Sequence, residues 1–157
     1  MNIAKLESVI GVEFHNKDLL QQSLVHRSYL NENPRFRLAH NERLEFLGDA
    51  VLELIVTELL YHAYPEKPEG ELTSLRAALV NSKMLSEIGE NINVNEFLLL
   101  SRGEAKDTGR ARQFILANAL EALIGAIYLD RGFTAAKELI ERTLMPQLPQ
   151  VLAQKLY

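Results

Sequence analysis

The stretch NERLEFLGDAVLELIVTELLY (residues 41–61) decides the fold. Its apolar residues recur at helical spacing and predict one long helix, from about His40 to Tyr64, that ends at Pro65. The side expected to face the core carries Leu44, Leu47, Val51, Leu54 and Ile55. Because this helix is apolar on most of its circumference, we expect neighbouring elements to bury it on most sides.

Three carboxylates of this helix form one ridge. Glu42, Glu45 and Asp49 follow one another at helical spacing and so stack on one side, while Phe46 and Glu53 lie on another side. Carboxylates that are half-buried together repel one another, and they need a cation or hydrogen bonds to stay ionised. No lysine interleaves the ridge, so a bound metal ion is the economical interpretation.

A second apolar helix carries another pair of oxygen ligands. In ILANALEALIGAIYLD (residues 115–130), Asn118 and Glu121 share one helical side. Taken alone, such a pair is more often a satisfied structural hydrogen bond. The two ridges together favour a shared site for a hard cation, Mg²⁺ or Mn²⁺ rather than zinc. A ferritin-like di-iron site would need Glu-x-x-His pairs, and Ile124 stands where that histidine would be.

Helical periodicity dominates the rest of the chain, with no persuasive strand or repeat. Helices are expected over residues 3–12, after an N-cap at Asn16, over 71–92 with an interruption at Asn81, over 110–129, over 134–144 and in a final stretch ending at Tyr157. Residues 30–39 and 103–109 are expected to be loops, and DRGF (130–133) a break between two helices. The sequence therefore predicts a single all-α domain over residues 1–157.

Composition narrows the class of protein. The chain has 157 residues, of which 47% are hydrophobic, and this suits one globular domain. It has no cysteine, which excludes disulfide partners and thiolate zinc sites. It also lacks an uninterrupted apolar run of about 20 residues that would cross a membrane, and its N-terminus lacks the pattern of a signal peptide. A cytoplasmic location without a membrane partner follows as the default expectation.

Charge is distributed unevenly along the chain. The formal net charge of −4 argues mildly against a partner held by bulk electrostatics. However, two stretches beside the acidic segments are rich in arginine: SRGEAKDTGRARQ (101–113) and PRFRLAHNER (34–43). These stretches are interpreted either as solvated loop charge or as contacts to phosphate groups, and both interpretations stay open.

Gly48 and Gly125 lie inside the two predicted acidic helices. Glycine within a helix costs about 1 kcal/mol relative to alanine, so another feature usually compensates for it. Close approach of a neighbouring helix would do so at each position. A second subunit is another candidate for the approaching partner.

These segments resemble a known family. HNERLEFLGDAVL (40–52) closely resembles the signature motif of the ribonuclease III family, endonucleases that cut double-stranded RNA. Three further segments are similar to that family: LVHRSYLNE (24–32), YPEKPEGELTSLRAALVNSKMLSEIG (64–89) and GEAKDTGRARQFILANALEALIGAIYLDRG (103–132). The resemblance therefore covers nearly the whole chain. It implies an all-α, homodimeric endonuclease domain. It also implies dependence on Mg²⁺, for which Mn²⁺ can substitute, and products with 5′-phosphate and 3′-hydroxyl ends and short 3′ overhangs.

The resemblance implies roles for the acidic residues. Asp49 and Glu121 match the carboxylates expected to be catalytic. The metal ligands are expected to be these two residues together with Glu45 and Asn118. Glu42 matches the outer acidic residue of the signature motif. Clustered carboxylates of this kind can hold cations that activate water and stabilise the leaving oxygen, so no nucleophilic side chain is needed.

Further roles concern a second subunit and the RNA. Glu69 matches an acidic residue that acts near the partner's site, and Phe46 matches an aromatic that inserts into a pocket of the other subunit. Gly48 is expected at the same dimer interface. The basic residues expected to contact RNA are Arg76, Arg110 and Arg112.

The chain departs from the family pattern at two places. Asn118 stands where the family typically carries an aspartate; its amide oxygen can still bind a cation, but one negative charge is lost. We expect activity to be retained because the other acidic positions are intact, and an inactivating change is the open alternative. The chain also ends at AQKLY (153–157) without the double-stranded-RNA-binding domain common in bacterial members, so we expect either a trimmed domain or a compact enzyme.

Two rival functions stay open. One is a catalytically weakened or silent dimer that binds structured RNA, and the other is a purely structural helical bundle, which leaves both acidic ridges unexplained. No convincing set of serine, histidine and aspartate is present, and His26, His40 and His62 are interpreted as structural or surface groups. The natural RNA is left open among ribosomal precursors, whose processing is one expected role, messengers and antisense duplexes.

Overall fold

The computed structural model describes residues 1–154, and these residues form helices and no strand. The α-helices are α1 (Ile3–Ile10), α2 (Lys17–Gln22), α3 (Arg27–Glu32), α4 (Glu42–Ala63), α5 (Glu69–Leu79), α6 (Ser82–Asn91), α7 (Arg102–Lys106), α8 (Arg110–Thr143) and α9 (Leu148–Gln154), with 3-10 helices η1 (Val94–Phe97) and η2 (Met145–Gln147). An isolated parallel bridge joins Val25 to Leu99. The predicted all-α class is confirmed.

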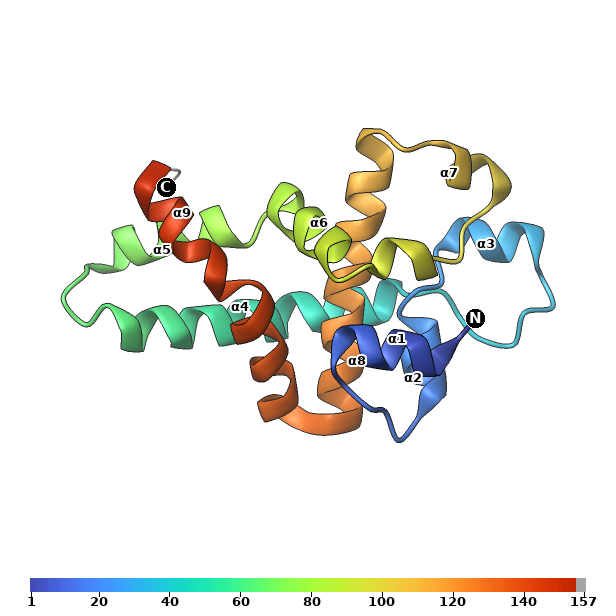
Figure 1. Cartoon of the computed structure of the whole chain (residues 1–157), viewed down its shortest axis with the longest axis horizontal. Helices are drawn as coiled ribbons and strands as arrows, with labels where there is room; N and C mark the ends of the chain where they lie inside the picture. Colours follow the sequence, from blue (N-terminus) through green and yellow to red (C-terminus); the bar gives the residue numbers. More distant parts are fainter. Residues whose placement is uncertain (155–157) are drawn as a thin grey trace.

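The two longest helices, α4 and α8, cross at the centre of the molecule (Figure 1). Glycines make this crossing close. A Cβ added at Gly48 would lie 1.6 Å from the carbonyl oxygen of Glu121, and one added at Gly125 would lie 2.4 Å from the carbonyl oxygen of Leu44. Gly48 is buried in this contact within the chain. Close approach of α8 thus accounts for a glycine at this position, and the expected role of Gly48 at a dimer interface stays a prediction.

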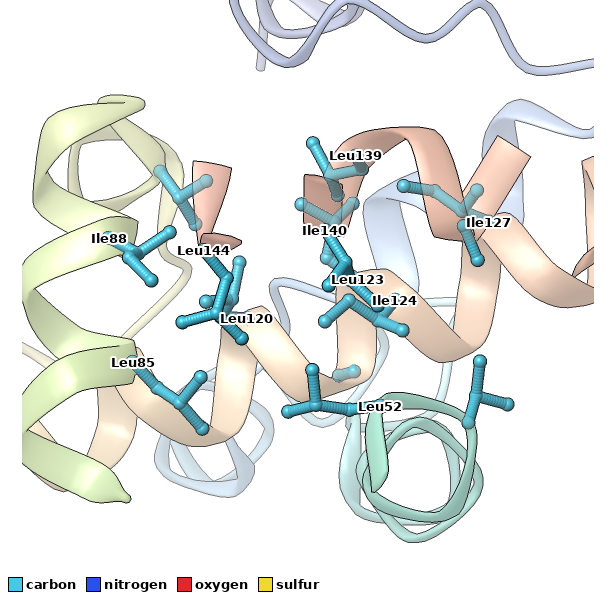
Figure 2. Packing of buried hydrophobic residues seen from close by; sticks show 14 of the residues in the cluster. Leu52, Leu85, Ile88, Leu120, Leu123, Ile124, Ile127, Leu139, Ile140 and Leu144 are labelled. Carbon is cyan, nitrogen blue, oxygen red and sulfur yellow. The ribbon is translucent and has the colours of Figure 1, made fainter. Parts of the chain in front are cut away.

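The core surrounds this crossing. Figure 2 shows Leu52 of α4 facing Leu123 and Ile124 of α8, while Leu85 and Ile88 of α6 face Leu120. All of these side chains are at most 3% exposed. Burial of this many apolar side chains is the main stabilising term of the fold, at about 25 cal/mol per Å² removed from water. It holds α4 and α8 in one relative orientation, on which the geometry described below depends.

The predicted break at residues 130–133 is a sharp kink inside α8. Gly132 has φ +88°, a value that favours glycine, and the helix changes direction there. The Asp130 carboxylate accepts hydrogen bonds from the backbone N–H groups of His15 (2.7 Å) and Asn16 (2.9 Å) and so ties the kink to the N-terminal segment. The stretch Arg110–Gln154 contains a window apolar enough to cross a membrane, but 56% of that window is buried in the fold, as in a core helix.

Several details differ from the sequence-based expectations. A short helix, α7, occupies part of the expected loop over 103–109, because the Ser101 hydroxyl caps its first turn by accepting the Glu104 N–H. Helix α4 is not buried on most sides: Phe46 is 83% exposed and Tyr61 66%. Leu54, expected in the core, is 57% exposed and follows Phe46 along the same outer side. The final stretch is helical to Gln154, and its predicted end at Tyr157 lies outside the described residues.

Candidate active site

The first turn of α4 is held in place by Asn41, the residue just before it. Asn41 is 6% exposed, and its side-chain amide donates to the carbonyl of Ser23 at 2.9 Å. Its backbone N–H donates to Val25, and its carbonyl accepts from the N–H of Glu45, both at 2.9 Å. The turn that carries Glu42 and Glu45 is thus fixed against residues 23–25. Sequence reasoning missed Asn41, although an asparagine before a helix is a known N-terminal signal.

Asp49 and Glu121 meet where α4 crosses α8. Burial raises the pKa of Glu121 to about 8, and a side-chain hydrogen bond with Asp49 and the nearby charges of Asp49, Glu45 and Glu53 add to the effect. The pKa of Glu45 is raised as well, by burial first and then by the charges of Glu42 and Asp49. The crossing therefore joins the two predicted ridges into one acidic cluster, and Glu53, expected on another side, lies near enough to act on it.

An open hollow of about 300 Å³ lies beside this cluster. Its lining consists of His26, Arg27, Asn41, Glu42, Glu45, Ile115 and Asn118. The hollow thus brings Asn118 of α8 next to the α4 carboxylates, as the metal-ligand prediction requires. No hydrogen bond of the Asn118 side chain is present within residues 1–154, so the alternative structural pairing with Glu121 is absent there, and the residue lines a ligand-accessible space.

The donor chemistry of this cluster fits a divalent cation. Within residues 1–154, no three Asp, Glu, His or Cys side chains already stand together around a metal position. The carboxyl of Glu121 instead interacts with that of Asp49, and this interaction adds to the effect of burial in raising the pKa of Glu121. Carboxylates and an amide carbonyl are the hard oxygen ligands that Mg²⁺ and Mn²⁺ prefer. Glu45, Asp49, Asn118 and Glu121 are the residues that would hold such an ion.

Two predicted residues lie away from the cluster of their own chain. Glu69 and Arg76 belong to α5, which lies near the C-terminal end of α4 (Figure 1). They line a different pocket, of about 610 Å³. At 1.5 Å per residue, that end lies roughly 20 Å along the helix from Asp49. Arg76 donates a hydrogen bond to the Thr57 hydroxyl at 2.8 Å. Neither residue can act on the acidic cluster of its own chain.

Arg112, expected to bind RNA, makes several hydrogen bonds within the fold. Its guanidinium donates to the side-chain carbonyl of Asn95 at 3.1 Å and to the backbone carbonyls of Glu104 and Ala105 at 3.0 Å each. These bonds tie α7 to the start of α8 and engage the charged group within the fold, while the RNA-binding role of Arg112 stays a prediction. Arg110 is exposed at the first position of α8 and remains available to an RNA partner.

The fold and its joined acidic ridges are those of a helical nuclease domain. A family model described as Ribonuclease-III-like matches residues 16–148, most of the chain. The chain belongs to the ribonuclease III family.

Relatives cover the chain almost completely. Ribonuclease 3 of Enterococcus faecalis is 44% identical over 144 residues, which are 92% of this chain and 63% of that protein. Ribonuclease 3 of Oceanobacillus iheyensis is 46% identical over 148 residues, 94% of this chain and 65% of that protein. The chain thus spans somewhat less than two thirds of the length of these relatives.

The solved structures point to the nuclease domain. A structure of the ribonuclease III nuclease domain from Campylobacter jejuni has a TM-score of 0.84 and 44% sequence identity, and the match covers 94% of this chain and 99% of that one. That structure is described for flexibility in a region involved in dimer formation. The similarity confirms the predicted ribonuclease III fold.

Proposed function

We propose that this chain is a divalent-metal-dependent endonuclease that hydrolyses double-stranded RNA in cytoplasmic RNA processing. Mg²⁺ is the proposed cofactor, with Mn²⁺ as a substitute, and the products carry 5′-phosphate and 3′-hydroxyl ends with short 3′ overhangs. The observation that carries the proposal is the interaction of Asp49 with Glu121 at the helix crossing, beside the hollow lined by Glu45 and Asn118. Membership of the ribonuclease III family supports it.

Individual residues of the chain would have separate roles in the proposed hydrolysis. A divalent cation, when bound, would polarise the scissile phosphate and lower the pKa of a bound water. Asp49 and Glu121 would hold that cation in place of the proton between them. Glu45 and Asn118 would complete its protein ligands from the wall of the hollow. Arg27, which lies 3.7 Å from the Glu42 carboxylate, places a cationic group at the rim where a phosphate would pass.

We also propose that the active form is a homodimer. Phe46, Leu54 and Tyr61 form an exposed apolar stripe along α4. The 610 Å³ pocket at the far end of α4 is lined by apolar and aromatic groups, including Leu60, Tyr64 and Leu72, and can receive an aromatic side chain. In a two-fold dimer that aligns the two α4 stripes in opposite directions, Phe46 of each subunit would enter this pocket of the other.

This arrangement would also account for Glu69. The pocket that would receive the partner's aromatic side chain is lined by Glu69 and Arg76. In such a dimer Glu69 would therefore lie close to the acidic cluster of the second subunit, although it is remote from the cluster of its own. Each active site would then be complete only in the dimer.

Cleavage of an end-labelled RNA duplex at low salt tests the proposal. We expect staggered cuts on both strands with Mg²⁺ or Mn²⁺, and no cuts with chelator or in Glu121→Gln. A DNA duplex of the same sequence should stay intact. Binding of the RNA without cleavage, by both the unmodified chain and Asn118→Asp, would replace this proposal with the silent RNA-binding alternative.

A further inference from the structure

His26 lies on the wall of the hollow that holds Glu42, Glu45 and Asn118. It immediately precedes α3 and is half-buried. Its backbone N–H donates to the carbonyl of Leu99 at 3.0 Å, next to the Val25–Leu99 bridge. The position of His26 relative to the acidic cluster is thus set by main-chain contacts on both sides of the residue.

Hydrogen bonds fix the orientation of the imidazole ring. The Nδ1 atom accepts the backbone N–H of Ser28 at 3.2 Å and lies 2.8 Å from the Ser28 hydroxyl oxygen. That hydroxyl oxygen in turn accepts the backbone N–H of Ser101 at 2.9 Å. With Nδ1 accepting from the Ser28 backbone, the Ser28 hydroxyl is free to donate its hydrogen to the same ring nitrogen while its oxygen accepts from Ser101.

This network selects one tautomer of the ring. A ring nitrogen that accepts from a backbone N–H carries no proton, so neutral His26 carries its proton on Nε2. Burial lowers the pKa of His26, which favours the neutral form. The structure shows no hydrogen-bond partner for Nε2 within residues 1–154. His26 therefore presents an oriented N–H donor on the side of the ring away from Ser28.

We propose that His26 binds the substrate: its Nε2–H donates a hydrogen bond to an oxygen of the RNA strand that enters the hollow, either a non-bridging phosphate oxygen or a ribose 2′-hydroxyl. This inference rests on the proposed endonuclease function. His26 would act beside Arg27, so that one segment supplies both a cationic and a neutral donor to the hollow that Glu45 and Asn118 also line. The capping role alone does not require an imidazole, because serine, aspartate or asparagine accepts the same Ser28 N–H.

The substitution His26→Asn separates the two roles. The asparagine side chain can cap α3 through its carbonyl oxygen, but it places no donor where Nε2 stands. His15→Asn is the matched control, because His15 is exposed and, within residues 1–154, only its backbone N–H is bonded, to Asp130. With a short RNA duplex and saturating Mg²⁺, we expect His26→Asn to lower kcat/KM by about tenfold, the loss of one hydrogen bond to a charged or polar oxygen. His15→Asn should match the unmodified chain, and both variants should keep its thermal midpoint.

Modified RNA distinguishes contact from a structural effect and identifies the acceptor. Single 2′-deoxy or methylphosphonate substitutions are placed in turn near the cut. At the contacted position the modification should slow the unmodified chain and cause no further loss in His26→Asn. Purely additive losses at every position, or equal cleavage by His26→Asn and the unmodified chain, would overturn the inference while leaving the endonuclease intact. An unmodified chain that neither binds nor cuts the duplex overturns the proposed function and this inference with it.

Discussion

The α-carbon of Gly48 lies so close to Glu121 that a Cβ on Gly48 would stand 1.6 Å from the Glu121 carbonyl oxygen. The backbones of α4 and α8 therefore touch at the turns that carry Asp49 and Glu121. This proximity allows the carboxyls of two helices to share a hydrogen bond. A structural glycine thus sets the geometry of the acidic site.

Gly48→Ala is expected to destabilise the fold by about 3 kcal/mol or more, because the clashing atom belongs to backbone and cannot rotate away. Urea unfolding measures the change. Gly70→Ala is the matched control: it also lies in a helix, nothing lies within 4 Å of an added Cβ, and helix propensity predicts a gain of up to about 1 kcal/mol. Equal stability of the two variants would show that the helices can separate without cost.

The metal-free protein should lose stability as pH rises from about 5 to about 8. The folded state keeps the Glu121 carboxyl protonated over this range, since its pKa is raised from 4.5 to about 8, whereas the unfolded chain has already released that proton. Fewer protons are then bound in the unfolded state, so the unfolding free energy falls with pH. Thermal unfolding in chelator across this range measures the slope.

Added Mg²⁺ or Mn²⁺ should raise the thermal midpoint more at pH 8 than at pH 5.5, because the cation competes with the proton for the carboxylates. Glu121→Gln should flatten the pH slope in chelator and greatly reduce the metal-dependent rise. A metal effect of equal size at both pH values in the unmodified chain would contradict this assignment of ligands.

Asn118→Asp should lower the Mg²⁺ concentration that gives half-maximal cleavage by about tenfold, equivalent to about 1.4 kcal/mol. The added carboxylate faces the same hollow as Glu45, and hard cations bind charged oxygens more tightly than amide oxygens. Cleavage rates against Mg²⁺ concentration provide the comparison. An unchanged metal dependence would mean that residue 118 is not a ligand.

Phe46→Ala should weaken the dimer by about 2 kcal/mol or more, roughly 30-fold in the dissociation constant, as for a buried aromatic anchor. Sedimentation equilibrium measures it. Thr73→Trp, which fills the 610 Å³ pocket from the other side of the same contact, should have a similar effect. Phe114→Ala, which removes an aromatic that is 48% exposed on α8, serves as the control and should leave the dimer intact.

Arg112 and Arg110 should respond in opposite ways to the same change. Arg112→Ala removes hydrogen bonds to Asn95, Glu104 and Ala105 and should cost about 2–3 kcal/mol of unfolding free energy. Arg110→Ala should leave stability unchanged and weaken RNA binding, with a shallower salt dependence. Paired unfolding and RNA-binding titrations test both statements. Loss of RNA affinity in a fully stable Arg112→Ala variant would restore the binding role that the hydrogen bonds argue against.

Local sequence patterns were enough to predict many of the helices and the breaks between them. The long helix, the break at residues 130–133 and the interruption at Asn81, whose side chain caps α6 by accepting the Met84 N–H, follow from spacing and from residues with strong backbone preferences. The assignment of Leu54 to the core was wrong, and the role of Arg112 could not be decided from the sequence, for a common reason. An apolar residue on a helix can face a core or a second molecule, and an arginine can bind a ligand or the protein's own carbonyls. Neighbours in sequence do not distinguish these cases.

Helical periodicity and residue chemistry were enough, without coordinates, to establish an all-α domain with two acidic ridges. The two ridges lie together because α4 and α8 cross. The crossing is set by glycines that let two backbones touch and by the apolar core that holds them there. The orientation of the His26 ring, and so the position of its Nε2–H donor, likewise depends on Ser28 and on Ser101, which is distant in sequence. Such contacts arise between segments remote along the chain, so only the packed structure decides them.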